Sequence, residues 1–333
     1  MSFLSMNFLL FLSVAILGYY VIPKRLQWVW LLLFSYIFYL ASGTTAVVFI
    51  LATTITTFLA GLILEYMDGK MDRELNGQTA GKLNGQTTGG LNSQTTWNPD
   101  TQPEKQTIPP PVPSSAATTS TSPLTPEQKK AVKARFKRNK KWIAAAALLI
   151  NFGILAVLKY RNFAVGNINQ LFGTDFALGK LILPLGISFY TFQAVSYIAD
   201  IYRGVKPVQK HIFRLALYIS LFPQILSGPI VKYNELEPQI EGRRESISMH
   251  AYGIRRFVYG LAKKMVFANM FGQVVDRIWG LPLEQLGTAV VWFTILLYSL
   301  QIYYDFSGYS DMAIGLGRMF GFTYQENFNY PYL

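Results

Sequence analysis

Two carboxylates, Asp305 and Asp311, lie near the end of a strongly apolar stretch of the chain. The preceding run, 289–304, contains no charged residue, as is typical of a segment inside a membrane. Ionisable groups at bilayer depth normally face a protein interior or a wet cavity, because lipid cannot solvate them. The two aspartates, with the hydroxyl groups of Ser307 and Tyr309 beside them, therefore form a candidate functional site.

Cysteine and histidine offer little further chemistry in this chain. Cysteine is absent, which excludes disulfides, thiolate metal sites and cysteine nucleophiles. The two histidines are His211, in a basic loop, and His250, at the start of an amphipathic stretch. We expect both to be ordinary interfacial residues rather than catalysts. We predict no metal site and no bound cofactor. We also predict no nucleic-acid partner.

The elements that position these residues have the composition of a polytopic membrane protein. Of 333 residues, 51% are hydrophobic and 14% charged, and the charges fall outside the long apolar runs. Several runs are shorter than the roughly 20 residues that a straight span needs. We therefore predict an all-α transmembrane bundle with broken or re-entrant helices. The expected spans are 3–22, 27–40, 46–64, 142–158, 181–199, 213–230, 257–278 and 289–304, followed by a separate helix over 311–322.

Basic residues predict how the chain is oriented in the membrane. Lys24 and Arg25 follow the first span, and a larger basic cluster over 129–141 precedes the fourth. The positive-inside rule assigns both to the cytoplasm, so the amino terminus is expected outside, with the connection 161–180. No basic segment or cleavage site typical of a removable signal peptide is found at the start.

Composition divides the chain into three parts: 1–66, 67–141 and 142–333. The middle part is rich in Gly, Asn, Gln, Thr, Ser and Pro, which predicts a disordered cytoplasmic insertion ending in a basic anchor. It holds imperfect repeats at 75–82, 83–90 and 91–96, which are too short for a solenoid. Replication slippage in a tolerant loop is the favoured explanation, and a partner-binding role is the alternative. The basic end is interpreted as the anchor of the next span rather than a helix lying on lipid.

The segment 183–204 differs from an ordinary membrane span. Pro184 and Gly186 disturb the helix start, and polar residues that include Ser188 and Gln193 form a stripe through it. Such a stripe either packs helix against helix or lines a cavity, and the sequence leaves both interpretations open.

The segment 221–238 contains prolines and glycine inside an apolar run. Either a kinked helix or a re-entrant element exposing Gln224 and Ser227 to a cavity explains this pattern. Two other motifs are rejected: GLAKKM at 260–265 lacks the glycine and hydroxyl residue of a phosphate loop, and the glycines of 315–321 lack dinucleotide-binding spacing.

A family resemblance is carried by several long segments in a fixed order. They are LPLGISFYTFQAVSYIADIYRG (183–204), LFPQILSGPIVKY (221–233), GLAKKMVFAN (260–269), and QIYYDFSGYSDMAIGLGRMFGF (301–322) leading into ENFNYPYL (326–333). Together they resemble the membrane-bound O-acyltransferase family, in particular its bacterial branch that O-acetylates alginate. The resemblance covers 3–66 and 142–333, and it leaves 67–141 without a counterpart.

This resemblance implies O-acylation in the bacterial inner membrane. A thioester donor, acetyl-CoA or another acyl thioester, would meet a hydroxyl acceptor in a funnel, and the acetyl group would pass through a periplasmic acetyltransferase to an exported polysaccharide. Eight residues are expected to line that funnel as orienting groups: Asp305, Ser307, Tyr309, Asp311, Asn327, Tyr330, Gln193 and Ser188. Their alternative role is a hydrogen-bonded network at a helix break.

In the family, a histidine that serves as catalytic base follows the segment matching 327–332. No such histidine matches here, so the expected residue lies beyond Leu333, and the chain is expected to be an amino-terminal part without activity of its own. The related branch that D-alanylates teichoic acids is the second choice. A transporter of a small anion or lipid-linked sugar is the alternative from another class, because broken helices and intramembrane aspartates suit it equally. A purely structural membrane subunit is a third possibility.

Overall fold

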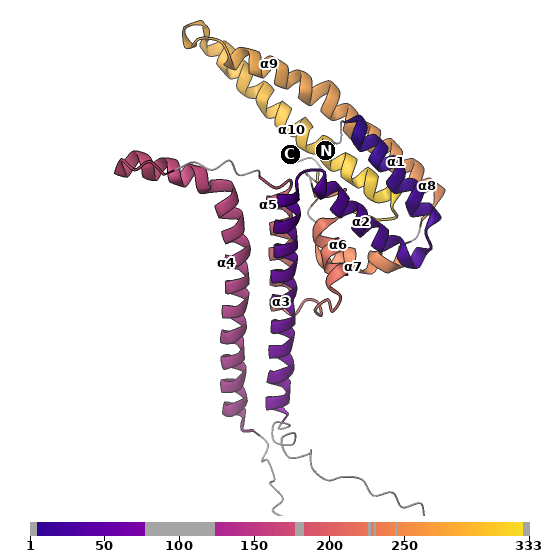
Figure 1. Cartoon of the computed structure of the whole chain (residues 1–333), viewed down its shortest axis with the longest axis vertical. Helices are drawn as coiled ribbons and strands as arrows, with labels where there is room; N and C mark the ends of the chain where they lie inside the picture. Colours follow the sequence, from indigo (N-terminus) through magenta and orange to yellow (C-terminus); the bar gives the residue numbers. More distant parts are fainter. Residues whose placement is uncertain are drawn as a thin grey trace, which may run out of the picture. The chain divides into compact units, whose positions relative to one another are not determined.

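We describe the protein from a computed structural model, whose described residues are 5–76, 124–176, 183–225, 228–229, 231–243 and 245–328. All regular structure in these ranges is helical, which confirms the predicted all-α fold class. The helices are α1 (Met6–Val21), η1 (Lys24–Leu26), α2 (Gln27–Leu40), α3 (Thr44–Leu75), α4 (Pro126–Phe172), α5 (Ile187–Tyr202), α6 (Ile212–Ser220), α7 (Tyr233–Gly242), α8 (Ile247–Ala262), η3 (Lys263–Ala268), α9 (Asn269–Trp279), η4 (Leu283–Gln285) and α10 (Thr288–Met319) (Figure 1).

Three helices in the described part, α3, α4 and α10, are long and apolar enough to cross a membrane, and α1 is a shorter apolar helix. The sequence-based prediction of a membrane protein is therefore confirmed. Two expected boundaries were wrong: α10 continues without interruption from 289–304 into the expected separate helix 311–322, as far as Met319, and the expected span 213–230 is helical only as far as Ser220. The intervening residues 305–310 are weak helix formers but include no proline, so nothing in the local sequence forces the helix to end there.

The chain divides into two compact units. One contains Met1–Glu65 and Lys140–Leu333, and the other is Tyr66–Asn139. In the second unit, the end of α3 and the start of α4 are joined by an ion pair in which Arg135 donates to Glu74 over 2.6 Å. The ends of the predicted disordered insertion are thus helical, over 67–75 and 126–141, and its remainder from 77 to 123 lies outside the described residues.

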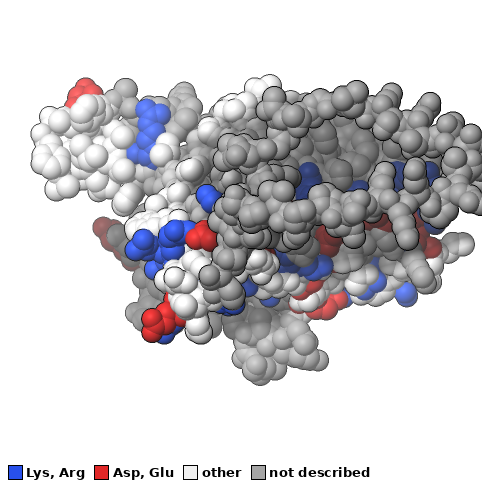
Figure 2. All heavy atoms as spheres, turned by 90° about the horizontal axis from the view of Figure 1, so that it is seen from below, with Lys and Arg blue, Asp and Glu red and all other residues white. Residues whose placement is uncertain are grey.

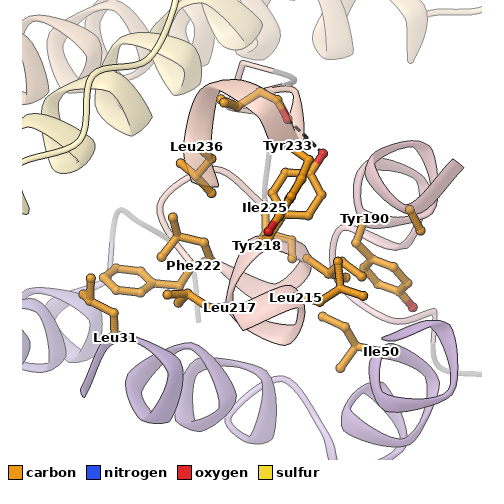
Figure 3. Packing of buried hydrophobic residues seen from close by; sticks show 14 of the residues in the cluster. Leu31, Ile50, Tyr190, Leu215, Leu217, Tyr218, Phe222, Ile225, Tyr233 and Leu236 are labelled. Atoms are coloured by element: carbon orange, nitrogen blue, oxygen red, sulfur yellow. Dashed lines mark hydrogen bonds between the residues drawn. The ribbon is translucent and has the colours of Figure 1, made fainter. Parts of the chain in front are cut away.

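The core of the larger unit surrounds a helix that stops early. The helix α6 ends at Ser220, and the following residues turn inside the protein, where Leu221, Phe222 and Ile225 are fully buried. Figure 3 shows this packing, with Phe222 near Leu31. The Phe222 amide donates to the Ser35 hydroxyl over 3.2 Å. Irregular backbone inside a membrane protein needs such partners. The chain thus turns inward as a re-entrant element would, but Gln224 is buried and donates to the Tyr218 carbonyl over 3.1 Å instead of facing a cavity, and Ser227 lies outside the described residues.

The start of α5 is shaped by the same turn. Gly186 precedes the helix with φ of +69°, a left-handed conformation that glycine adopts readily. A Cβ atom at this position would lie 2.4 Å from the carbonyl oxygen of Ile225, so the close approach also requires glycine. The polar residues of α5 pack inside the unit: Gln193 is buried, and the Tyr197 hydroxyl accepts a hydrogen bond from the Gln209 amide over 3.0 Å.

The helices α8, η3 and α9 follow one another and lie along α10 as the two arms of a long hairpin (Figure 1). The expected single span 257–278 is thus a composite of α-helical and π-helical turns. The first half of α10 is mostly exposed, whereas its second half, from Ser307 to Gly317, is buried. Ser307, Tyr309 and Asp311 therefore lie on the buried half of this helix, and Asp305 lies just before it.

Candidate functional site at the α8–α10 contact

Glycines bring α8 and α10 into backbone contact. A Cβ atom on Gly260 would lie 2.5 Å from the carbonyl oxygen of Gly308, and one on Gly315 would lie 2.6 Å from the carbonyl oxygen of Gly253. Small residues at helix contacts permit this close approach in membranes, where van der Waals packing and interhelical hydrogen bonds drive association. As a result, polar side chains on either side of these glycines can reach across the contact.

The π-helical turn η3 begins at Lys263, immediately after α8. Such single turns insert one extra residue into a helix and are frequent at functional sites. Here the turn places Lys263 and its neighbour Lys264 against two different aspartates of α10: Lys263 contacts Asp311 and Lys264 contacts Asp305.

Asp311 is the centre of the charged contacts. Only 6% of this residue is exposed, and both of its carboxylate oxygens accept hydrogen bonds from cations. Arg256 donates to Oδ1 through Nε over 2.8 Å, and the Lys263 Nζ donates to Oδ2 over 2.6 Å. The buried carboxylate is thus held by two charge-assisted hydrogen-bonded partners, which offset the cost of removing it from water.

Asp305 lies nearer the exposed half of α10. Its carboxylate pairs with Lys264, while 41% of its side chain is exposed. The Lys264 ammonium also lies 5.3 Å from the centre of the Tyr309 ring, within cation–π range. Asp305 and Tyr309 therefore both contact the Lys264 ammonium group.

Arg256 extends the contacts beyond α10, because its second partner is Glu326 in the segment that follows the helix. That segment is also held by α7: the Thr323 amide donates to the Gln239 side chain over 2.7 Å, and the Gln239 amide group donates back over 3.1 Å. We call Arg256, Lys263, Lys264, Asp305, Asp311 and Glu326 the Asp311 cluster. It connects α8, η3, α10 and the segment 323–328.

The charges of the Asp311 cluster balance, with three basic and three acidic side chains. Basic and acidic side chains also lie next to one another on the face shown in Figure 2.

A cavity of about 360 Å³ adjoins the Asp311 cluster. It is lined by Arg256, Tyr259, Ala262, Lys263, Phe267 and Asp311.

Of the eight residues predicted from sequence, the structure brings Asp305, Tyr309 and Asp311 together at this contact. Ser307 is buried on the same helix, and within the described part of the chain its hydroxyl has no hydrogen-bond partner. Asn327 is exposed.

The other predicted residues lie elsewhere. Ser188 and Gln193 belong to α5, which packs mainly on α6 and α7. An aromatic contact between Phe189 and Phe306, with ring centres 6.5 Å apart, links α5 to α10. Tyr330 is outside the described residues.

The cations of the cluster were missed by the sequence analysis, although a signal for two of them exists. Lys263 and Lys264 fall inside the expected span 257–278, where charged residues are as unusual as aspartates. The same reasoning that selected Asp305 and Asp311 therefore also selects these lysines. Nothing in the sequence pattern pairs each lysine with its aspartate.

The two histidines contact ordinary structural partners. His211 immediately precedes α6 without capping it through its side chain, and its backbone amide donates to the Gln209 side chain over 2.9 Å. The Nδ1 atom of His250 lies 2.9 Å from the Tyr20 hydroxyl, at the edge of a cavity of about 440 Å³. Neither histidine is part of the Asp311 cluster.

The helical fold and the long apolar helices define an all-α membrane protein, and comparison with known proteins shows which family part of the chain resembles. Residues 206–332 match the model of the MBOAT, membrane-bound O-acyltransferase family. The chain therefore carries a segment of this family, as the resemblance in the sequence indicated.

The chain is also similar to individual family relatives. It is 38% identical over 203 residues to a probable alginate O-acetylase AlgI from Pseudomonas aeruginosa, a match over 60% of this chain and 38% of the relative. It is 34% identical over 213 residues to a peptidoglycan O-acetyltransferase from Helicobacter pylori, covering 56% of this chain and 40% of the relative. A teichoic acid D-alanyltransferase from Bacillus subtilis is 29% identical over 160 residues, or 46% of this chain and 40% of the relative. The chain thus spans less than half the length of these relatives.

Proposed function

We propose that this protein acts in membrane-embedded O-acyl transfer, moving an acetyl group from a cytoplasmic thioester towards an exported polysaccharide. The observation that carries the proposal is the similarity to alginate and peptidoglycan O-acetyltransferases, together with a family match that contains the whole Asp311 cluster. Acetyl-CoA or another acyl thioester would be the donor. Alginate or a related envelope polymer would be the acceptor, reached through a periplasmic acetyltransferase.

The geometry of the Asp311 cluster supports an orienting role rather than a nucleophilic one. Both oxygens of Asp311 already accept hydrogen bonds from cations, so the carboxylate is engaged before any substrate arrives. The cluster instead fixes the segment 323–328 to α7 and α8. Precise placement of reacting groups is a large part of enzymatic rate enhancement, and rigid supports of this kind provide it. We propose that the adjoining cavity of about 360 Å³ is part of the funnel and that its lining residues form the funnel wall.

The proposed location is the bacterial inner membrane, with the amino terminus outside. The basic residues on 129–141 support this orientation through the positive-inside rule. A cytoplasmic donor and an external acceptor then face opposite ends of the helical unit.

The test is complementation. The full reading frame that contains this sequence is expressed in an alginate-producing bacterium that lacks its own membrane O-acetylase, and the O-acetyl ester content of the secreted polymer is measured. We expect esters to be restored. Replacement of Asp311 by Asn should lower the ester content by at least tenfold at equal protein level, while replacement of the exposed Asp276 should leave it unchanged.

Different outcomes separate the alternatives. D-alanyl esters on a cell-wall polymer, without acetyl esters, would assign the protein to the teichoic acid branch. Normal membrane insertion with no ester of either kind, whichever acceptor polymer is supplied, would contradict the acyl-transfer proposal.

A further inference from the structure

A second feature, separate from the Asp311 cluster, is an apolar groove on the surface of the larger unit. It has a volume of about 600 Å³ and lies between α2, α3 and α6. Its exposed lining is wholly apolar and includes Val29 and Leu33 of α2, Leu51 and Ile55 of α3, and Phe213 of α6. These side chains are 40% or more exposed, so the groove is open along its length.

The groove exists because two of its helices are too short to span a bilayer. The 14 residues of α2 rise about 21 Å and the nine of α6 about 14 Å, against a hydrocarbon core of about 30 Å. At Ser220 the chain leaves α6 and turns into the protein instead of continuing along the surface. The groove between α2, α3 and α6 lies beside this early end of α6.

Basic and aromatic side chains mark one end of the groove. Lys24 and Arg25 are exposed on η1, one helical turn before the groove residue Trp28. The guanidinium of Arg214 lies 6.0 Å from the centre of the Trp28 ring. Tryptophan is typical of the membrane interface, so this end lies at the level of the lipid headgroups. Arg214 is paired with Glu241, which leaves Lys24 and Arg25 as the exposed positive charges.

We propose that this groove binds an anionic phospholipid of the surrounding membrane, with one acyl chain between α2, α3 and α6 and the phosphate beside Lys24 and Arg25. The groove runs along α2 from Trp28 to Tyr36, a rise of about 12 Å. That length is close to half of the hydrocarbon core, which is the depth of one leaflet. The apolar lining suits the chain, and the exposed positive charges select a negative headgroup. This inference is independent of the proposed acyl transfer.

The absence of cysteine allows a direct test with single labels. Leu33→Cys carries a fluorophore in the groove, and Leu296→Cys carries the same fluorophore on α10, which does not line it. Both proteins are placed in phosphatidylcholine vesicles containing a minor fraction of phosphatidylglycerol. Two vesicle samples are compared. In one, the acyl chains of the phosphatidylglycerol are brominated so that they quench the fluorophore, and in the other, those of the phosphatidylcholine are brominated.

Brominated phosphatidylglycerol should quench the Leu33→Cys label several times more strongly than its share of the lipid predicts, and the Leu296→Cys label in proportion to that share. Replacing Lys24 or Arg25 by Gln should weaken the preference by up to roughly fivefold for each charge, and replacing both should remove it. Equal quenching at the two positions, or a preference that survives the Gln substitutions, would overturn the proposal. A groove label quenched by neither lipid would mean that a protein segment or a second copy of the chain fills the groove, which would also overturn it.

Discussion

At the scale of single residues, Asp311 shows how a charge is accommodated at the buried helix contact. It is nearly inaccessible, yet it touches Arg256 and Lys263, and it reaches Glu326 through Arg256. The mutual attraction of buried ions only offsets their desolvation, so the pair contributes little net stability. Removing one partner is costly, because it leaves the others buried and uncompensated.

Replacing Asp311 by Leu is therefore expected to destabilise the protein by about 3–5 kcal/mol, and replacing it by Asn by less, because an amide still accepts hydrogen bonds. Thermal unfolding in detergent measures the effect. Asp276→Leu on α9 is the control, since that side chain is exposed. If the Asp311→Leu protein unfolds at the same temperature as the wild type, the Asp311 cluster does not stabilise the contact between α8 and α10.

At the scale of helices, two contacts depend on glycine for different reasons. Between α8 and α10, Gly260 faces backbone atoms of Gly308 and Met312 at 2.5 and 2.7 Å from an added Cβ. Backbone atoms in a helix cannot move aside as a flexible side chain can. A larger residue at this position must therefore push the two helices apart.

Gly260→Ala is expected to cost about 1–3 kcal/mol of stability through overpacking and to weaken the Asp311 cluster that the contact aligns. Gly153→Ala on α4 is the matched control, because a Cβ there meets nothing within 4 Å. Its stability should equal or slightly exceed the wild type, since alanine favours helix. Thermal unfolding of the two variants side by side compares the costs, and equal melting temperatures would contradict the predicted close contact.

The second glycine contact is made by Gly186 at the turn before α5. Comparing this position with Gly204 distinguishes the cost of backbone strain from the cost of overpacking. Gly186 and Gly204 have similar positive φ values, +69° and +72°, but only Gly186 has a neighbour, the carbonyl oxygen of Ile225, in the way of a Cβ. Alanine at either position costs about 1–2 kcal/mol for the left-handed conformation. Gly186→Ala should therefore destabilise clearly more than Gly204→Ala in chemical or thermal unfolding. Equal losses would place Ile225 farther from α5 than the structure shows.

At the scale of the whole molecule, α4 is a candidate membrane span that is longer than a bilayer requires. Its 47 residues correspond to a length of about 70 Å along the helix, far more than the bilayer thickness. Its basic start and its polar end are therefore expected on opposite sides of the bilayer. The excess of basic residues at the start, 129–141, predicts which side is cytoplasmic.

Single cysteines test this orientation. Lys137→Cys, near the start of α4, should react with a membrane-impermeant maleimide only in inside-out vesicles. Asp175→Cys, just after α4, should react only in intact spheroplasts. Both positions are exposed, so a failure to react reports sidedness rather than burial. The reverse labelling pattern would contradict the proposed orientation, because the start of α4 would then lie outside the cytoplasm, where the thioester donor is proposed to be.

The sequence by itself determined the class of protein and the family resemblance. Long apolar runs indicate membrane helices whatever their neighbours are, because every backbone polar group in lipid must be satisfied locally. The same reasoning located Asp305 and Asp311 as costly residues. It also predicted a break within 221–238, because prolines and a glycine interrupt an apolar run there; the structure is irregular over 221–225 and helical again from Tyr233.

Only the tertiary structure decided which groups those aspartates meet. Lys263 and Asp311 are 48 residues apart in the chain, and their pairing depends on glycines that let α8 and α10 touch and on a π-helical turn. Arg256 and Glu326 are brought together over 70 residues in the same way. Periodicity and propensity describe neighbours along the chain, whereas these ion pairs result from how closely two separate helices can approach.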